Sequence, residues 1–217
     1  MTSHIARETE KLKRRLLTLG ADVEELYLQA VHSLENLDEE LAKKVTESDD
    51  RIDRQEVDIE EECLKVLALH QPVANDLRFI VSVLKINNDL ERIADLAVNI
   101  SERALDLMKT PPMPIPFHFT AMSQKVYSMV KKSLDSLVNL DLHEAHEVIA
   151  LDDEVDALHH QSYGLVVERM RQQPERMEEL VSYLVVSRYL ERIADQATNI
   201  AEDVHYLIEG DIVRHIM

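Results

Sequence analysis

The hexapeptide Leu-Glu-Arg-Ile-Ala-Asp occurs twice in this chain, at residues 90–95 and again at residues 190–195. Each copy places a glutamate and an aspartate four residues apart: Glu91 and Asp95 in the first copy, Glu191 and Asp195 in the second. On a helix, side chains four residues apart lie on one face, one above the other. Each half of the chain is therefore predicted to present a pair of carboxylates that act together.

A second acidic pair with the same spacing precedes each hexapeptide. Its members are Asp49 and Asp53 in the first half, and Asp152 and Asp156 in the second. When both pairs of one half lie on neighbouring antiparallel helices, four carboxylates converge. Their repulsion is then relieved only by protonation, by an arginine or by a cation. We therefore predict a metal site in each half, with Arg92 and Arg192 as the arginines that compete for these carboxylates.

A plainer interpretation of these residues stays open. Acidic residues at helical spacing are common on solvated faces, where arginine pairs satisfy some of them. The repetition of the same four residue types at unchanged spacing favours the metal sites. His159, three residues after Asp156, is either a further ligand of the second site or a surface histidine.

The remaining chemistry-bearing residues form no catalytic motif. His143 and His146 lack the His-Glu-x-x-His spacing of zinc proteases. Glu202 and His205 make a single Glu-x-x-His, whereas di-iron bundles use two in one four-helix site. The absence of a glycine-rich phosphate loop excludes ATP hydrolysis. Cys63 falls on an apolar seam and is interpreted as an inert core residue.

The composition predicts an all-α protein. The 217 residues include only three glycines and three phenylalanines, and no tryptophan. This bias toward helix formers, without the aromatic signal of β-strands, predicts almost no strand. A chain of this length holds one large domain or two of about 100 residues, and the internal repeat favours two.

Apolar residues at alternating steps of three and four predict six helices. In the first half the helices are expected over residues 12–37, over residues 38–70 with Asp38 as the cap, and from Pro72 for about 35 residues. Four prolines within residues 110–117 end the third helix and predict a stiff connector. The second half repeats this scheme.

The predicted fold is thus all-α, with two tandem pseudo-symmetric three-helix bundles made of six long antiparallel helices. The bundles are expected at residues 1–109 and 118–217, joined by the connector at residues 110–117. At about 100° per residue, Glu91 and Asp95 point away from the apolar seam of their helix. We therefore expect the acidic stripes on the outer face of each bundle.

The formal net charge of -18 predicts a surface that repels nucleic acid and anionic lipid and suits a cation or a basic partner. The basic cluster at residues 11–15 is interpreted as a solvated stretch of the first helix. A single cysteine and a polar N-terminus without a signal peptide predict a cytoplasmic protein. No apolar run reaches about 18 residues, so membrane association is expected only through a partner.

The chain resembles the phosphate-uptake regulator family, PhoU, over essentially its full length. The similarity is carried by the two hexapeptides, by the Asn-Ile/Glu segment after each, by Gln71-Pro72-Val73-Ala74-Asn75-Asp76-Leu77-Arg78 and by Leu207-Ile208-Glu209-Gly210. Two hexapeptides at this separation are specific, whereas one Glu-x-x-x-Asp alone carries little information. The departures are modest, namely Leu96 against Gln196 and an unusually proline-rich connector.

The resemblance implies a cytoplasmic, often homodimeric regulator rather than an enzyme. Such a protein lowers phosphate-starvation signalling by acting between a phosphate ABC transporter and a membrane sensor histidine kinase. Some members of the family bind metal ions through Glu/Asp-x-x-x-Asp motifs, and others have been seen without metal. The metals implied here are iron, zinc, manganese or magnesium. The matching positions are Asp49, Asp53, Glu91 and Asp95 in one half and Asp152, Asp156, Glu191 and Asp195 in the other.

Three classes of function follow from these observations. The first is a non-enzymatic adaptor whose acidic stripes hold cations that shape a surface or bridge to a partner. The second is a helical scaffold without metal. The third is a metal-dependent oxidase or phosphohydrolase, which is disfavoured because the stripes are poor in histidine and expected on an outer face.

Overall fold

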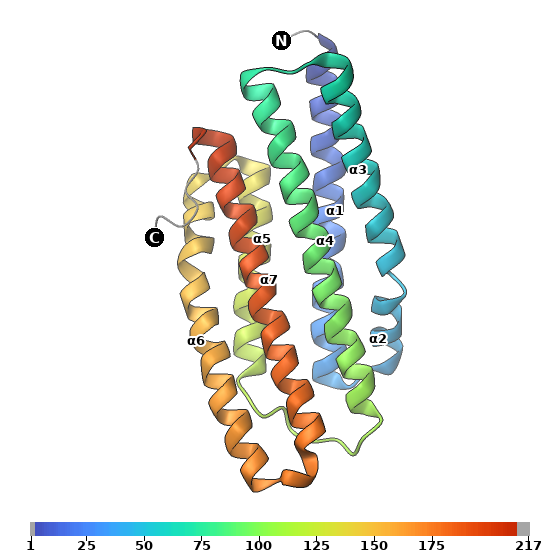
Figure 1. Ribbon diagram of the computed structural model, residues 1–217, viewed down its shortest axis with the longest axis vertical. Helices are drawn as coiled ribbons and strands as arrows, with labels where there is room; N and C mark the ends of the chain where they lie inside the picture. The colour runs from blue at the N-terminus through green and yellow to red at the C-terminus, as the bar shows by residue number, and fades with distance from the viewer. Residues whose placement is uncertain (1–2, 212–217) are drawn as a thin grey trace.

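Helices make up nearly all of the structure, a computed structural model that describes residues 3–211 (Figure 1). No strand is present within that range, and the predicted all-α fold class is confirmed. The helices are α1 (Ser3–Asn36), α2 (Glu39–Thr46), α3 (Asp49–His70), α4 (Ala74–Met108), α5 (Phe119–Asn139), α6 (Leu142–Gln172) and α7 (Met177–Glu209), the last preceded by a 3-10 turn at Pro174–Arg176. None of the helices described here is both long and apolar enough to cross a membrane.

The helices form two bundles that lie side by side (Figure 1). The first bundle contains α1 to α4, with α2 and α3 following one another in the same direction, and the second contains α5, α6 and α7. At the centre, α4 and α7 pack against each other and join the bundles, and α1 also contacts α5. The proline-rich connector runs between the end of α4 and the start of α5.

The apolar seams of the helices meet in one continuous core. Three seam residues around each hexapeptide are fully buried: Leu90, Ile93 and Ala97 in α4, and Leu190, Ile193 and Ala197 in α7. Burial of a leucine or isoleucine side chain contributes about 1.5–3 kcal/mol to stability. Because α4 packs on α7, core residues of both bundles belong to a single cluster. Both hexapeptides are therefore anchored on the same core.

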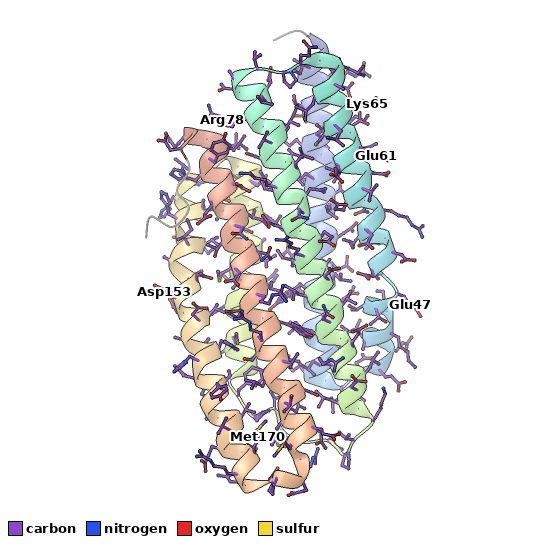
Figure 2. The ribbon with its side chains drawn as sticks, in the orientation of Figure 1. Glu47, Glu61, Lys65, Arg78, Asp153 and Met170 are labelled. Carbon is purple, nitrogen blue, oxygen red and sulfur yellow. The ribbon has the colours of Figure 1, made fainter. Side chains whose placement is uncertain are left out.

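The helix predicted over residues 38–70 is interrupted, and its predicted continuity was wrong. The first piece, α2, ends at Thr46, and α3 begins at Asp49. Between them the Ser48 hydroxyl donates a 2.8 Å hydrogen bond to a backbone carbonyl of the preceding turn. Serine side-chain bonds of this kind compete with helical structure. Figure 2 shows the exposed Glu47 at this junction.

Several helix ends follow from local side-chain chemistry. Asp38 accepts a hydrogen bond of 3.0 Å from the Leu41 N–H and caps α2, as predicted. Leu37 and Leu140 follow the last residues of α1 and α5 with φ angles of 52° and 53°. A left-handed backbone takes a residue out of the helical periodicity. These two leucines, which the seam pattern includes, are therefore exposed by 37% and 50%.

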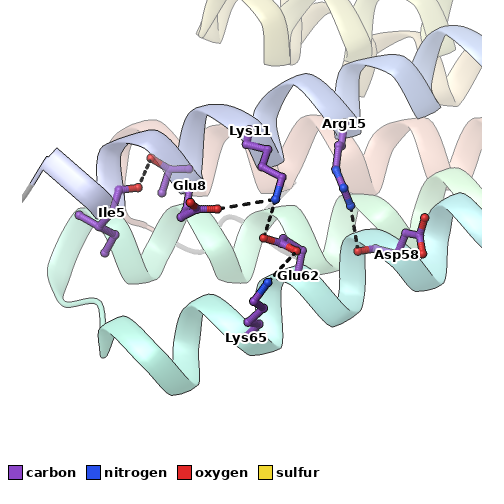
Figure 3. A network of polar contacts seen from close by, with 8 residues as sticks. Ile5, Glu8, Lys11, Arg15, Asp58, Glu62 and Lys65 are labelled. Carbon is purple, nitrogen blue, oxygen red and sulfur yellow. Dashed lines mark hydrogen bonds and ion pairs between the residues drawn. The ribbon is translucent and has the colours of Figure 1, made fainter.

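The basic cluster of α1 lies against acidic groups of α3 (Figure 3). Lys11 Nζ is 2.9 Å from Glu62 Oε1 and 3.8 Å from Glu8 Oε2. Arg15 donates to the backbone carbonyl of Asp58 over 3.5 Å. Exposed pairs of this kind contribute only about 0–1 kcal/mol each. The cluster is thus a partly solvated face that helps to hold α1 beside α3.

An ion pair with a buried carboxylate joins the two bundles. Lys85 Nζ of α4 lies 2.9 Å from Asp203 Oδ1 of α7, and the residue Asp203 is only 2% exposed. The same ammonium group lies 5.1 Å from the centre of the Tyr206 ring, in a cation–π contact. A buried carboxylate is costly unless it is paired. The pair therefore favours one register of α4 on α7.

Replacement of Lys85 with methionine should lower the free energy of unfolding by about 2 kcal/mol, because it removes the cation beside a buried carboxylate. Urea unfolding followed by circular dichroism measures this loss. Lys65→Met is the matched control, since Lys65 is exposed and lies 3.7 Å from Glu62. It should change stability by less than about 0.5 kcal/mol. Equal effects of the two substitutions would argue against a structural role for the buried pair.

Candidate metal centres

The first acidic cluster lies where α3 begins beside α4. Asp49 is the first residue of α3, Asp53 follows one turn later, and Asp95 comes from α4. One carboxylate oxygen of each residue lies within 4.8 Å of the other two. The antiparallel packing of α3 on α4 thus brings three of the four carboxylates predicted for this site into one small volume.

The donor atoms of this cluster fit a hard cation. Ligand atoms of one ion are at most about 5 Å apart, because each lies about 2.0–2.6 Å from the ion. Asp49 Oδ1 is buried and has no hydrogen-bond partner, so an oxygen that a cation would satisfy is already in place. Carboxylate oxygens suit magnesium and manganese and also bind iron and zinc.

Glu91, the fourth residue predicted for this site, adds to the cluster through its charge. Burial first, and then repulsion by the neighbouring Asp95 and Asp53, raise the pKa of Glu91 to about 7. Burial and neighbouring aspartates also raise the pKa of Asp49. Near neutral pH Glu91 is therefore protonated in part of the molecules, and a cation would stabilise its charged form.

Glu56 is a member of the first cluster that the sequence analysis missed. Its charge raises the pKa of Glu91, and its Oε1 accepts a hydrogen bond of 3.1 Å from Asn87 Nδ2. Glu56 could have been found from the sequence by its position. It follows Asp53 by three residues, just as His159 follows Asp156 in the second half.

The second acidic cluster lies between α6 and α7. Asp152 and Asp156 come from α6, and Glu191 and Asp195 come from α7. Burial first, and then the charges of Asp195 and Asp156, raise the pKa of Asp152 to about 6. Burial also raises the pKa values of Glu191 and Asp195. Asp152 Oδ1 and Glu191 Oε2 are buried without hydrogen-bond partners.

The two clusters differ in how closely their ligand atoms meet. Within residues 3–211, only the first cluster brings three such atoms within 4.8 Å of one another. In the second, the Arg188 guanidinium donates a hydrogen bond to Glu191 Oε1. A protein cation therefore already lies at one of the four predicted ligands.

The arginine that contacts the second cluster is not one of those predicted. Arg92 and Arg192 are exposed and act only through their charge, which lowers the pKa of a neighbouring carboxylate. Arg188, which the sequence analysis did not single out, forms the hydrogen bond instead. Its signal is a position three residues before Glu191, which puts both side chains on one face of α7.

Asp95 is exposed, as predicted for an outer face, but the other three residues of the acidic stripes are less exposed than predicted. Glu191 is only 9% exposed, and Glu91 and Asp195 are partly buried. The helical angles correctly place these residues off the apolar seam of their own helix. They say nothing of the neighbouring helices, and α3 and α6 cover part of these side chains. The exposed Asp53 and Asp156 mark the solvent side of the two clusters.

The histidines and the cysteine have separate environments. His159 Nδ1 lies 2.6 Å from Oγ of the buried Ser187, and burial lowers the pKa of this histidine. His143 pairs instead with Glu147 at 3.4 Å on the surface. Cys63 is fully buried and its pKa is raised to about 12 by that burial, which suits an inert core residue.

Comparison with known proteins identifies the class to which this arrangement belongs. The family model described as the PhoU domain matches twice, at residues 16–104 and at residues 119–204. Each match contains one hexapeptide and one acidic cluster. The chain therefore belongs to the PhoU family, and the family predicted from the hexapeptides is confirmed.

Individual relatives resemble the chain over nearly its whole length. The phosphate-specific transport system accessory protein PhoU homolog of Aquifex aeolicus (strain VF5) is 40% identical over 209 residues, which cover 96% of this chain and 95% of that protein. The crystal structure of PhoU from Pseudomonas aeruginosa has a TM-score of 0.92 at 36% identity and covers 95% of this chain and 99% of that chain. The phosphate transport system regulatory protein PhoU from Streptococcus pneumoniae has a TM-score of 0.85 at 28% identity, with coverages of 96% and 99%.

The raised pKa of Glu91 predicts a pH-dependent stability of the metal-free protein. The folded state retains a proton that the unfolded state releases between the ordinary value of 4.5 and about 7. This contribution to stability is therefore complete below the unfolded pKa and is lost as the pH rises through the folded pKa. Between about pH 5 and about pH 8, the melting temperature should fall less in Glu91→Gln than in the unsubstituted chain, by about 2–4 °C. The control is Glu61→Gln, at the exposed α3 glutamate labelled in Figure 2, and it should leave the pH dependence unchanged.

Proposed function

We propose that this chain is an accessory protein of phosphate uptake that acts as a negative regulator of phosphate-starvation signalling. In this role it is a cytoplasmic adaptor between a phosphate ABC transporter and a sensor histidine kinase, and it works as a homodimer. The observation that carries the proposal is the presence of two PhoU domains that together span most of the chain. The names of the relatives from Aquifex aeolicus and Streptococcus pneumoniae, which place those proteins in phosphate transport, support it.

The same proposal assigns a structural role to metal in the acidic clusters. A divalent or trivalent ion, drawn from iron, zinc, manganese and magnesium, binds Asp49, Asp53 and Asp95, with Glu91 beside them. The support is the convergence of three ligand atoms within 4.8 Å and the unpartnered Asp49 Oδ1. Such an ion compensates carboxylates that burial and mutual repulsion disfavour in the charged form, and it gives the surface a positive centre that a partner carboxylate or phosphate can reach.

A scaffold without metal is the second candidate, and the second cluster favours it. There Arg188 supplies a positive charge to Glu191 from within the chain. Protonation of Asp152 and Asp195, whose pKa values are raised by burial and by neighbouring carboxylates, then completes the compensation. In this case the clusters set the shape and charge of a docking surface. A catalytic role is not proposed, since the first cluster consists of carboxylates alone, without the histidine ligands usual in metal-dependent oxidases and hydrolases.

Deletion of the gene should raise the expression of phosphate-starvation genes in high-phosphate medium, because the link that reports sufficient phosphate is lost. A reporter fused to a phosphate-starvation promoter measures this change. Reintroduction of the unsubstituted gene should restore repression, and an empty vector should not. Normal repression in the deletion strain would reject the regulatory proposal.

Elemental analysis separates the metal-binding adaptor from the scaffold without metal. Protein purified without chelator should contain a stoichiometric transition metal or magnesium, and the combined Asp49→Ala, Asp53→Ala, Glu91→Ala and Asp95→Ala variant should lose it. A variant with alanine at the exposed residues Asp50, Arg54, Glu60 and Glu61 of the same helix controls for general effects on α3. Equal metal content in the two variants would favour adventitious binding.

A further inference from the structure

The internal repeat allows the two acidic clusters to be compared position by position. The four predicted ligands are identical in type in the two halves. Two neighbouring positions differ: Asn88 in α4 corresponds to Arg188 in α7, and Glu56 in α3 corresponds to His159 in α6. Each substitution makes the second cluster more positive or less negative than the first.

Arg188 is bound into the second cluster. Its guanidinium pairs with Glu191 Oε1, and Glu191 is nine-tenths buried. The other oxygen, Glu191 Oε2, is buried without a hydrogen-bond partner, and the side chain is coupled electrostatically to Asp195, Asp156 and Asp152. One oxygen of this carboxylate is thus satisfied by the protein, and the other is buried without a hydrogen-bond partner.

The first cluster has no comparable partner. Within residues 3–211, no lysine or arginine lies within ion-pair distance of Asp49, Asp53, Glu91 or Asp95. Asn88, at the position of Arg188, is exposed and uncharged. In this cluster three ligand atoms already meet within 4.8 Å. The half of the chain whose carboxylate oxygens lie closest together is thus also the half without a lysine or arginine beside them.

We infer that Arg188 is the resident counter-ion of the second cluster, so that the two halves form one strong and one weak cation site. A divalent ion enters the first cluster directly, whereas in the second it meets a guanidinium already paired with Glu191, and that positive charge opposes its binding. The inference rests on the proposed metal binding and adds a specificity-determining residue to it.

Exchange of the differing residues between the halves tests the inference. The probe is Mn²⁺, titrated calorimetrically into metal-stripped full-length protein, with the electron paramagnetic resonance signal of free Mn²⁺ as a second readout. The unsubstituted chain should show a tight and a weak site. Arg188→Asn should tighten the weak site, and Asn88→Arg should weaken the tight one, each by about 10- to 100-fold. Arg192→Asn, which removes an exposed arginine next to Glu191, is the matched control and should change either affinity much less.

Thermal denaturation of the metal-stripped protein gives a readout that does not depend on metal loading. Arg188→Asn should lower the melting temperature more than Arg192→Asn, and added Mn²⁺ should recover the difference. Circular dichroism of each variant checks that the helices are intact, and Arg188→Lys, which keeps the charge, should behave like the unsubstituted chain.

The outcomes separate this inference from the proposed function. Two sites of equal affinity, or a weak site unchanged by Arg188→Asn, would overturn the inference while metal binding stands. Failure of both clusters to bind Mn²⁺, Zn²⁺ or Fe²⁺ would overturn the metal proposal and the inference together. Asymmetric binding that responds to both exchanges supports them.

Discussion

The packing of α4 against α7 is the constraint on which the rest of the structure depends. Each helix carries a hexapeptide whose leucine and isoleucine are fully buried in the shared core. Since the same six residues also contain the acidic pair, burial of the apolar face fixes the direction of the carboxylates. The clusters are thus positioned by hydrophobic packing, which is strong enough to hold groups that repel one another.

Much of the fold could be predicted from the sequence because the apolar residues recur with the helical period. That period reports directly which face of a helix is buried. Leu90, Ile93 and Ala97 lie where it predicts, and so do their counterparts in the second half. The break before Asp49 could not be predicted in this way, because it depends on hydrogen bonds from Ser48 to the backbone. Leu37 likewise has the right spacing for a core residue, but its backbone has already left the helix.

The candidate site was predictable only as far as the two halves agree. Comparison of the repeats drew attention to identical residues, and three of those in the first half do meet. Arg188 could not be found in this way, because the corresponding residue of the first half is an asparagine. The burial of Glu191 could not be predicted either, because it depends on how closely α6 packs on α7 and not on the positions of residues around one helix. The repeated residues indicated a type of site common to the two halves. The differences between the two clusters come from neighbouring residues that are not repeated.

The interruption between α2 and α3 gives the first cluster a backbone contribution that the second lacks. Asp49 occupies the first turn of a helix, where free backbone N–H groups favour a negative charge, whereas Asp152 lies inside the uninterrupted α6. An ion held between Asp49 and Asp95 would also fasten the opening turn of α3 to the middle of α4. Metal bound at this place would therefore hold a helix end in the first bundle, whereas the corresponding stretch of the second bundle lies within a continuous helix.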